Sequence, residues 1–131
     1  MRAEVGVQVR MESDLSGKII VVVDDHEALR HSMRGLLEAY GAKILVYKCG
    51  NDFLRDLPPA DCVVLDYYMP GSNGLELASE LRSRAYGAPV ILLTGMSNEI
   101  PKNWTAFGVT VVVDKLSGAD ELLRMIHRHA T

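Results

Sequence analysis

The sequence predicts an α/β fold in which a parallel sheet is covered by helices on both faces. Five short, uninterrupted apolar runs recur along the chain, and a segment with helical periodicity follows each of them. Such runs are typical of strands that are buried on both faces of a sheet. Because a helix joins each strand to the next, we expect the strands to run parallel, with helices on both sides.

The first two units occupy the N-terminal half. A strand is expected at residues 19–23, and it runs into Asp24 and Asp25. Apolar residues then recur at helical spacing until Gly41 stops the helix: Ala28, Leu29, Met33, Leu36, Leu37 and Tyr40. The second strand is expected at residues 44–46, and a short helix over residues 51–57 is broken by two prolines.

The third unit, residues 62–77, is the most informative stretch of the chain. An apolar run over residues 63–65 ends abruptly in Asp66, and a turn over residues 69–74 leads into a helix. The buried face of that helix is expected to contain Leu77, Ala78 and Leu81. Asp66 would therefore lie at the carboxyl edge of the sheet, where open α/β folds place their sites.

The last two units repeat the pattern. A strand over residues 90–93 ends in Thr94, and a weaker helical stripe of Ile100, Trp104 and Phe107 predicts a fourth helix. Pro101 and Asn103 make that helix weak. A strand over residues 109–113 runs into Asp114 and Lys115, and the final helix is marked by Leu122, Leu123 and Ile126.

Residues 18–131 are predicted to form one domain, since no linker or low-complexity segment divides them. Residues 1–17 are different, because Val5, Val7, Val9 and Met11 alternate with polar residues or glycine. This alternation is compatible with an added edge strand or a dimer contact, and a loose tail is the simpler interpretation.

Composition excludes several classes of function. The net charge of −3 gives no electrostatic case for binding nucleic acid or an anionic membrane. The longest apolar stretches are far too short for a membrane span, so a soluble cytoplasmic protein is expected. Cys49 and Cys62 lack the spacing of a zinc site and are interpreted as reduced structural cysteines.

The reactive side chains all fall at predicted strand ends: Asp24, Asp25, Asp66, Thr94 and Lys115. In a parallel sheet these ends share one edge, so we expect the side chains to meet. Two carboxylates 4 Å apart repel by roughly 4 kcal/mol at an effective dielectric constant of 20. Either a shared proton or a hard divalent cation such as Mg²⁺ would relieve that repulsion.

This group of side chains suits phosphoryl transfer. A carboxylate such as Asp66 can act as a nucleophile and form an aspartyl-phosphate. Lys115 would place a positive charge on a phosphoryl oxygen, and Thr94 would donate a hydrogen bond to another. Mg²⁺ takes one or two carboxylates and leaves room for phosphate oxygens, which makes it the expected cofactor.

The combined pattern resembles the receiver domain of two-component response regulators. It comprises Asp24-Asp25, Asp66 with Met69-Pro70-Gly71 and Gly74, Thr94-Gly95, and Lys115, and covers roughly residues 18–130. The resemblance implies a flavodoxin-like (βα)5 three-layer sandwich with a five-stranded sheet of order 2-1-3-4-5. It implies that Asp66 takes a phosphoryl group from a sensor histidine kinase or phosphotransfer protein.

The same resemblance implies the roles of the other residues. Asp25 and Asp66 would bind Mg²⁺ directly, Asp24 through water, and the backbone carbonyl of Tyr68 would complete the protein ligands. Thr94 and Lys115 would contact the phosphoryl oxygens and switch the surface formed by the fourth helix, fifth strand and fifth helix. The protein would be a phosphoacceptor with slow self-dephosphorylation at most, not a conventional enzyme.

The sequence departs from the family pattern in three places. Leu116 stands where proline usually follows the lysine, and Val112 stands where an aromatic residue commonly takes part in switching. Tyr68 is bulky at a position that would overhang the phosphate, and we predict that it slows the attack of water on the phosphorylated state.

These departures leave a second function open, a receiver-like module that binds proteins without phosphorylation. A phosphohydrolase resembling the haloacid-dehalogenase class fits poorly, because residues 24–26 lack the required Asp-x-Asp pattern. A flavodoxin fits less well still, since carboxylates after the first strand would repel the cofactor's phosphate. His26 lies close enough to the acids to influence them, whereas the remaining histidines are expected at the surface.

The expected partners follow from the receiver interpretation. They are the phosphodonor and a downstream output domain or protein, with no direct contact to nucleic acid or membrane. A homodimer is left open. The sequence ends at Thr131, shortly after the last predicted helix, so we expect a stand-alone receiver or a part of a longer regulator or hybrid kinase.

Overall fold

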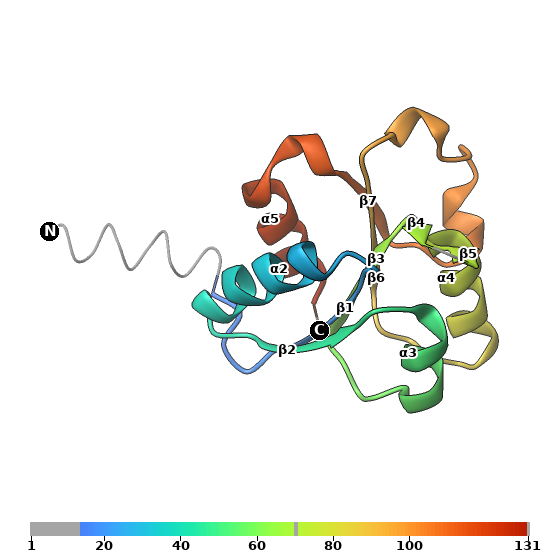
Figure 1. Ribbon diagram of the computed structural model, residues 1–131. Coiled ribbons are helices and arrows are strands. Elements are labelled where there is room, and N and C mark those ends of the chain that lie inside the picture. The colour runs from blue at the N-terminus through green and yellow to red at the C-terminus, as the bar shows by residue number, and fades with distance from the viewer. Residues whose placement is uncertain (1–13, 70, 131) are drawn as a thin grey trace, which may run out of the picture.

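A computed structural model describes residues 14–69 and 71–130 of the chain (Figure 1). Its sheet has five parallel strands in the order β2-β1-β3-β6-β7. These strands are β1 (Ile19–Val23), β2 (Lys43–Tyr47), β3 (Cys62–Asp66), β6 (Val90–Thr94) and β7 (Val111–Asp114). Counted along the chain this order is 2-1-3-4-5, so the predicted fold class and strand order are confirmed. The alternation predicted for residues 5–11 lies outside the described residues.

Helices cover the two faces of the sheet in pairs. Helices α2 (Glu27–Ala39) and α5 (Ala119–His129) lie on one face, and α3 (Gly50–Asp56) and α4 (Gly74–Ser83) lie on the other (Figure 1). Successive residues of a strand point to opposite faces, so each strand supplies both cores. In β1, for example, Val22 joins the core under α2 and α5, while Val21 joins the core under α3 and α4.

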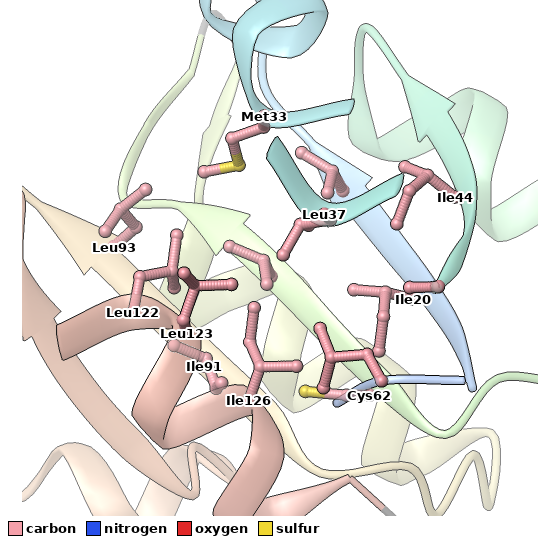
Figure 2. Packing of buried hydrophobic residues seen from close by; sticks show 14 of the residues in the cluster. Ile20, Met33, Leu37, Ile44, Cys62, Ile91, Leu93, Leu122, Leu123 and Ile126 are labelled. Atoms are coloured by element: carbon pink, nitrogen blue, oxygen red, sulfur yellow. The ribbon is translucent and has the colours of Figure 1, made fainter. Parts of the chain in front are cut away.

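Figure 2 shows how the core under α2 and α5 is filled. Met33 and Leu37 of α2 approach Leu122, Leu123 and Ile126 of α5 across the strands. Cys62 belongs to this core as a fully buried free thiol, and burial raises its pKa to about 12. The packing role predicted for Cys62 agrees with this position.

The prediction of an α-helix between β6 and β7 is wrong. The segment contains two short 3₁₀ turns, η1 (Ser97–Glu99) and η2 (Trp104–Phe107). Pro101 supplies no backbone N–H for an α-helical ladder, and Gly108 ends the segment with a φ of 89°. Ile100 is nonetheless buried, and Trp104 and Phe107 pack half-buried against the core beneath α4.

Between β3 and α4 the chain forms a small antiparallel pair, β4 (Tyr68–Met69) and β5 (Ser72–Asn73). Asn73 then starts α4 with a capping box. Its side chain accepts a hydrogen bond from the Glu76 N–H at 2.9 Å, and the Glu76 carboxylate accepts one from the Asn73 N–H at 3.0 Å. This fixed start of α4 determines where the turn after Asp66 closes.

One further 3₁₀ turn, η3 (Lys115–Ser117), joins β7 to α5. Among the described residues, no helix combines the length and apolar character needed to cross a bilayer.

Candidate functional site

The strand ends bring the predicted site residues to one edge of the sheet. Val23 of β1 pairs with Leu65 of β3, so Asp24 and Asp66 follow at neighbouring positions. Asp66 in turn pairs with Leu93, which directly precedes Thr94. The parallel register alone therefore places three polar residues together at the carboxyl edge.

The carboxylates form a tight, largely buried group. Asp24 is 1% exposed and Asp66 is 3% exposed, while Asp25 lies at the rim. One ligand atom from each of Asp24, Asp25, Asp66 and His26 can be chosen so that all four lie within 4.8 Å of one another. This is the clustering of acids that the strand ends predict.

Lys115, the first residue after β7, joins this group. Its Nζ lies 3.1 Å from Oδ1 of Asp66, which forms an ion pair on the pocket side of the carboxylate. Burial nevertheless raises the pKa of Asp66, and repulsion from Asp24 and Asp25 adds to the rise, although the Lys115 hydrogen bond lowers it. The protein alone therefore does not fully compensate the charge of Asp66.

Three carboxylate oxygens without hydrogen-bond partners indicate which kind of ligand would compensate the negative charge of the pocket. Oδ2 of Asp24, Oδ1 of Asp25 and Oδ2 of Asp66 are buried and accept no hydrogen bond from another described residue. Oδ1 of Asp25 lies 3.3 Å from His26 Nδ1, but without hydrogen-bond geometry. Unsatisfied buried carboxylates are costly, and an all-oxygen set of this kind fits a hard divalent cation such as Mg²⁺.

Thr94 is buried at the end of β6. Its hydroxyl oxygen accepts a hydrogen bond from the Met96 N–H at 3.0 Å, which fixes the turn after the strand. No other described residue accepts the hydroxyl hydrogen, so that hydrogen can be donated to a ligand.

Gly74 allows the chain to close tightly behind Asp66. Its N–H donates to the Tyr67 carbonyl at 2.9 Å. A Cβ at this position would lie 2.8 Å from the Asp66 carbonyl oxygen and 2.5 Å from a Leu92 methyl group. Only glycine lets α4 begin this close to the strand that carries Asp66.

Asp114 connects two loops that border the pocket. One carboxylate oxygen accepts the Leu116 N–H at 2.8 Å, and the other accepts the Ser97 hydroxyl at 3.1 Å. The loop after Thr94 is thereby joined to the residue that precedes Lys115. From the sequence, Asp114 is recognised only as a residue at the end of the last strand, and its contact with Ser97 is not predicted.

The three departures from the family pattern have distinct positions. Leu116 is 86% exposed, and every peptide bond in the described ranges is trans, including the bond to Leu116. Val112 packs partly buried against the core under α3 and α4. Tyr68 is half exposed, and its hydroxyl donates a hydrogen bond to the Glu99 carboxylate. That hydrogen bond raises the pKa of Tyr68.

His26 lies beside the acids, as its sequence position predicts, whereas the sequence does not reveal the contact of Glu99 with Tyr68. His26 is the N-cap residue of α2, and its N–H donates to Oδ1 of Asp24 at 2.9 Å. Its place directly after two acids is a usable signal for His26. Glu99 carries none, because its contact with Tyr68 depends on how two loops fold.

Fold and pocket together define a signalling domain of the two-component class. The chain belongs to the response regulator receiver domain family, which it matches over residues 20–127. The receiver assignment from the strand-end residues is thereby confirmed.

Curated relatives agree with this family. The transcriptional regulatory protein FixJ of Azorhizobium caulinodans is 37% identical over 103 residues, which are 77% of this chain and 45% of FixJ. Two further regulators, from Bradyrhizobium diazoefficiens and Rhodobacter capsulatus, are matched over 38% and 40% of their lengths. The chain thus spans less than half the length of these curated relatives.

Solved structures share the fold. The response regulator TrrA from Thermotoga maritima, in complex with Mg²⁺-BeF, is 32% identical with a TM-score of 0.77. The match covers 85% of this chain and 97% of that one. TrrA in complex with the histidine kinase ThkA gives 31% identity and a TM-score of 0.77, over 87% of this chain and 99% of that one.

Proposed function

We propose that Asp66 is the phosphoacceptor and takes a phosphoryl group from a phosphohistidine of a sensor histidine kinase or phosphotransfer protein. One observation carries this proposal. Asp66 keeps Lys115 Nζ 3.1 Å from one carboxylate oxygen, while its other oxygen has no partner among the described residues. A nucleophile needs such an open oxygen, and a developing phosphoryl charge needs such a cation.

The transfer assigns a task to each residue. An oxygen of Asp66 forms a bond to phosphorus as the bond from phosphorus to the histidine nitrogen breaks, and the electron pair of that bond stays on the nitrogen. Lys115 offsets the negative charge on the phosphoryl oxygens. Thr94 donates its hydroxyl hydrogen to one of them.

Asp24, Asp25, Asp66 and the carbonyl of Tyr68 would hold Mg²⁺. The bound ion would neutralise the charge that accumulates in the pocket. The fit rests on the unpartnered buried oxygens of the three aspartates. Binding of Mg²⁺-BeF by TrrA supports the same assignment by similarity.

Phosphorylation would switch the surface formed by the η1–η2 segment, β7 and α5. Moving a population from 1:99 to 99:1 requires about 5.5 kcal/mol of differential interaction. New charge-assisted contacts from Lys115 and Thr94 to a dianion are of suitable size. Asp114 supports this route, because it directly precedes Lys115 and its carboxylate accepts a hydrogen bond from Ser97 of η1.

The domain acts in signalling, and its turnover would be restricted to slow loss of its own phosphate. Its partners would be the kinase or phosphotransfer protein and an output domain or protein downstream. The ThkA–TrrA complex and the longer FixJ relatives support these partners by similarity. We expect no direct binding to nucleic acid or to a membrane. A cytoplasmic location and an optional homodimer remain predictions.

The experiment is incubation with acetyl phosphate and Mg²⁺, followed by intact-mass measurement. We expect the parent to gain one phosphoryl group and Asp66→Asn to gain none. Asp120→Asn, an exposed carboxylate on α5, is the matched control and should behave as the parent. An equal gain in parent and Asp66→Asn would contradict the assignment.

The phosphorylation-independent module is the second candidate. Exposed Leu116 and core-packed Val112 favour it, because neither supplies the usual switching residue. Beryllofluoride with Mg²⁺ separates the two functions when amide NMR spectra are recorded. Shifts at Thr94 and across η1 support the switch, whereas unchanged spectra support the module.

A further inference from the structure

We propose that His26 is a nitrogen ligand of the acidic pocket and biases it toward divalent transition ions over Mg²⁺. The inference rests on the metal site of the proposed function and names a ligand outside its oxygen set. It concerns which ion the pocket selects, whereas the proposed function concerns what happens at Asp66.

The backbone holds His26 at the pocket. His26 directly follows the two acids at the end of β1, and its N–H donates to Oδ1 of Asp24 at 2.9 Å. Its φ of −88° and ψ of 111° are ordinary extended values, and its side chain makes no capping hydrogen bond to α2. The imidazole is therefore anchored beside the carboxylates without a structural task in the helix.

The ring presents Nδ1 to the acids. Nδ1 lies 3.2 Å from Oδ1 of Asp24 and 3.3 Å from Oδ1 of Asp25. Donor atoms bound to one ion at 2.0–2.2 Å lie roughly 3 to 4.4 Å apart. Since donors of all four residues lie within 4.8 Å of one another, little movement brings them into one coordination sphere.

Two further observations indicate a ligand. Oδ2 of Asp24 and Oδ2 of Asp66 are buried and accept no hydrogen bond in the described part of the chain, and both residues are more than nine-tenths buried. In the absence of an ion, Nδ1–H donates to the Asp24 carboxylate at 3.2 Å, because a carboxylate can only accept. The His26 side chain is 63% exposed, so an ion that binds Nδ1 can displace this proton, through water, to Nε2. The cluster therefore has open oxygens and an available nitrogen on the same side.

The chemistry of this donor set differs from that of carboxylates alone. Mg²⁺ binds oxygen ligands almost exclusively, whereas an imidazole nitrogen strengthens binding of first-row transition ions. Mn²⁺ accepts both donor types and is paramagnetic, which makes it the suitable probe. We expect the parent to bind Mn²⁺ at least ten-fold more tightly than Mg²⁺.

The test compares parent, His26→Gln and the control His31→Gln, whose side chain is exposed on α2. Calorimetry measures the affinities of Mn²⁺ and Mg²⁺, and pulsed EPR of the Mn²⁺ complex detects coupling to a ligating ¹⁴N nucleus. Parent and His31→Gln should show that coupling. His26→Gln should lose it, together with several-fold in Mn²⁺ affinity, while its Mg²⁺ affinity stays within about two-fold.

Three results would overturn the inference. Absence of ¹⁴N coupling in the parent would show that His26 does not bind the Mn²⁺ ion. Equal loss or gain of both affinities in His26→Gln would show that His26 acts as a general charge partner of the acids. Failure of both ions to bind the parent would overturn the metal site of the proposed function as well, which separates that outcome from the first two.

Discussion

The ammonium nitrogen of Lys115 lies 3.1 Å from Oδ1 of Asp66, yet this ion pair does not make Asp66 an easily ionised carboxyl group. Burial and the neighbouring charges of Asp24 and Asp25 outweigh Lys115, so the pKa of Asp66 is raised. In the absence of a cation, the folded pocket thus favours the protonated form of Asp66 more than the unfolded chain does.

The first prediction concerns pH and stability. Because the folded-state pKa of Asp66 is raised, the stabilisation from its protonation is present below the ordinary aspartate pKa and lost as pH rises through the folded value. Metal-free Asp66→Asn should therefore be more stable than the parent at neutral pH, because it removes a buried charge that the pocket does not fully compensate. The difference should shrink as the pH falls into the ordinary aspartate range.

Urea unfolding of both proteins across this pH range, in the presence of a chelator, measures the difference. Asp120→Asn is the control for removal of an exposed negative charge and should show no such gain. A pH-independent difference, or a less stable Asp66→Asn at neutral pH, would contradict the first prediction.

The second prediction tests the close approach at Gly74. Gly74→Ala should lower the free energy of unfolding by about 1–3 kcal/mol, because the added methyl group meets the Asp66 carbonyl oxygen at 2.8 Å and backbone must shift. Gly35→Ala in α2 is the matched control. A Cβ there meets nothing within 4 Å, so we expect a gain of about 0.5–1 kcal/mol. Equal effects of the two substitutions would count against the prediction.

The third prediction concerns Arg82, which stabilises the loops beside α4. Its guanidinium donates to the carbonyls of Tyr86, Ala88 and Gly108 at 2.6–3.1 Å, and partial burial lowers its pKa. Arg82→Ala should cost about 2–4 kcal/mol, because it leaves these carbonyls without their charged donor.

Arg84→Ala provides the comparison for Arg82. Arg84 forms an exposed pair with Glu80 at 2.9 Å, and such pairs contribute about 0–1 kcal/mol. Thermal and urea unfolding of both variants should therefore differ clearly. A loss for Arg82→Ala no greater than that for Arg84→Ala would refute a stabilising role for the three carbonyl contacts.

The fourth prediction concerns the lifetime of the phosphorylated state. Tyr68→Asn should shorten the phosphate half-life several-fold, because the smaller side chain admits water beside Asp66. Tyr68→Phe keeps the ring and removes only the hydrogen bond to Glu99, so its half-life should stay near that of the parent. Loss of phosphate is followed by intact mass after removal of the donor. A half-life for Tyr68→Asn equal to or longer than the parent's would exclude this role.

The sequence predicts most of the fold because buried parallel strands have a local signature. The apolar runs around Val21, Val64 and Leu92 appear as strands, and the strand order that the receiver resemblance implies is confirmed. The meeting of Asp66 and Lys115 was predictable for a topological reason: parallel strands deliver their last residues to one edge whatever their distance in sequence. The roles of these residues in phosphoryl transfer stay predictions.

What the sequence could not predict depends on contacts between segments. Apolar spacing at Ile100, Trp104 and Phe107 suggests a helix, but the segment buries these side chains through two 3₁₀ turns. Apolar periodicity reports which residues are buried and says less about the backbone that buries them. The partner of Tyr68 likewise arises only when separate loops come together, whereas the His26 ring contacts acids of its own loop.

Asp114 uses one carboxylate oxygen to hold the turn that follows it and the other to hold Ser97 of η1. These two hydrogen bonds join the backbone before Lys115 to the start of η1. A displacement of Lys115 toward a newly bound anion is therefore expected to displace Ser97 through Asp114. Because η1 and η2 are short 3₁₀ turns and not an α-helix, this displacement can change the shape of the outer surface without breaking the hydrogen bonds of a regular helix.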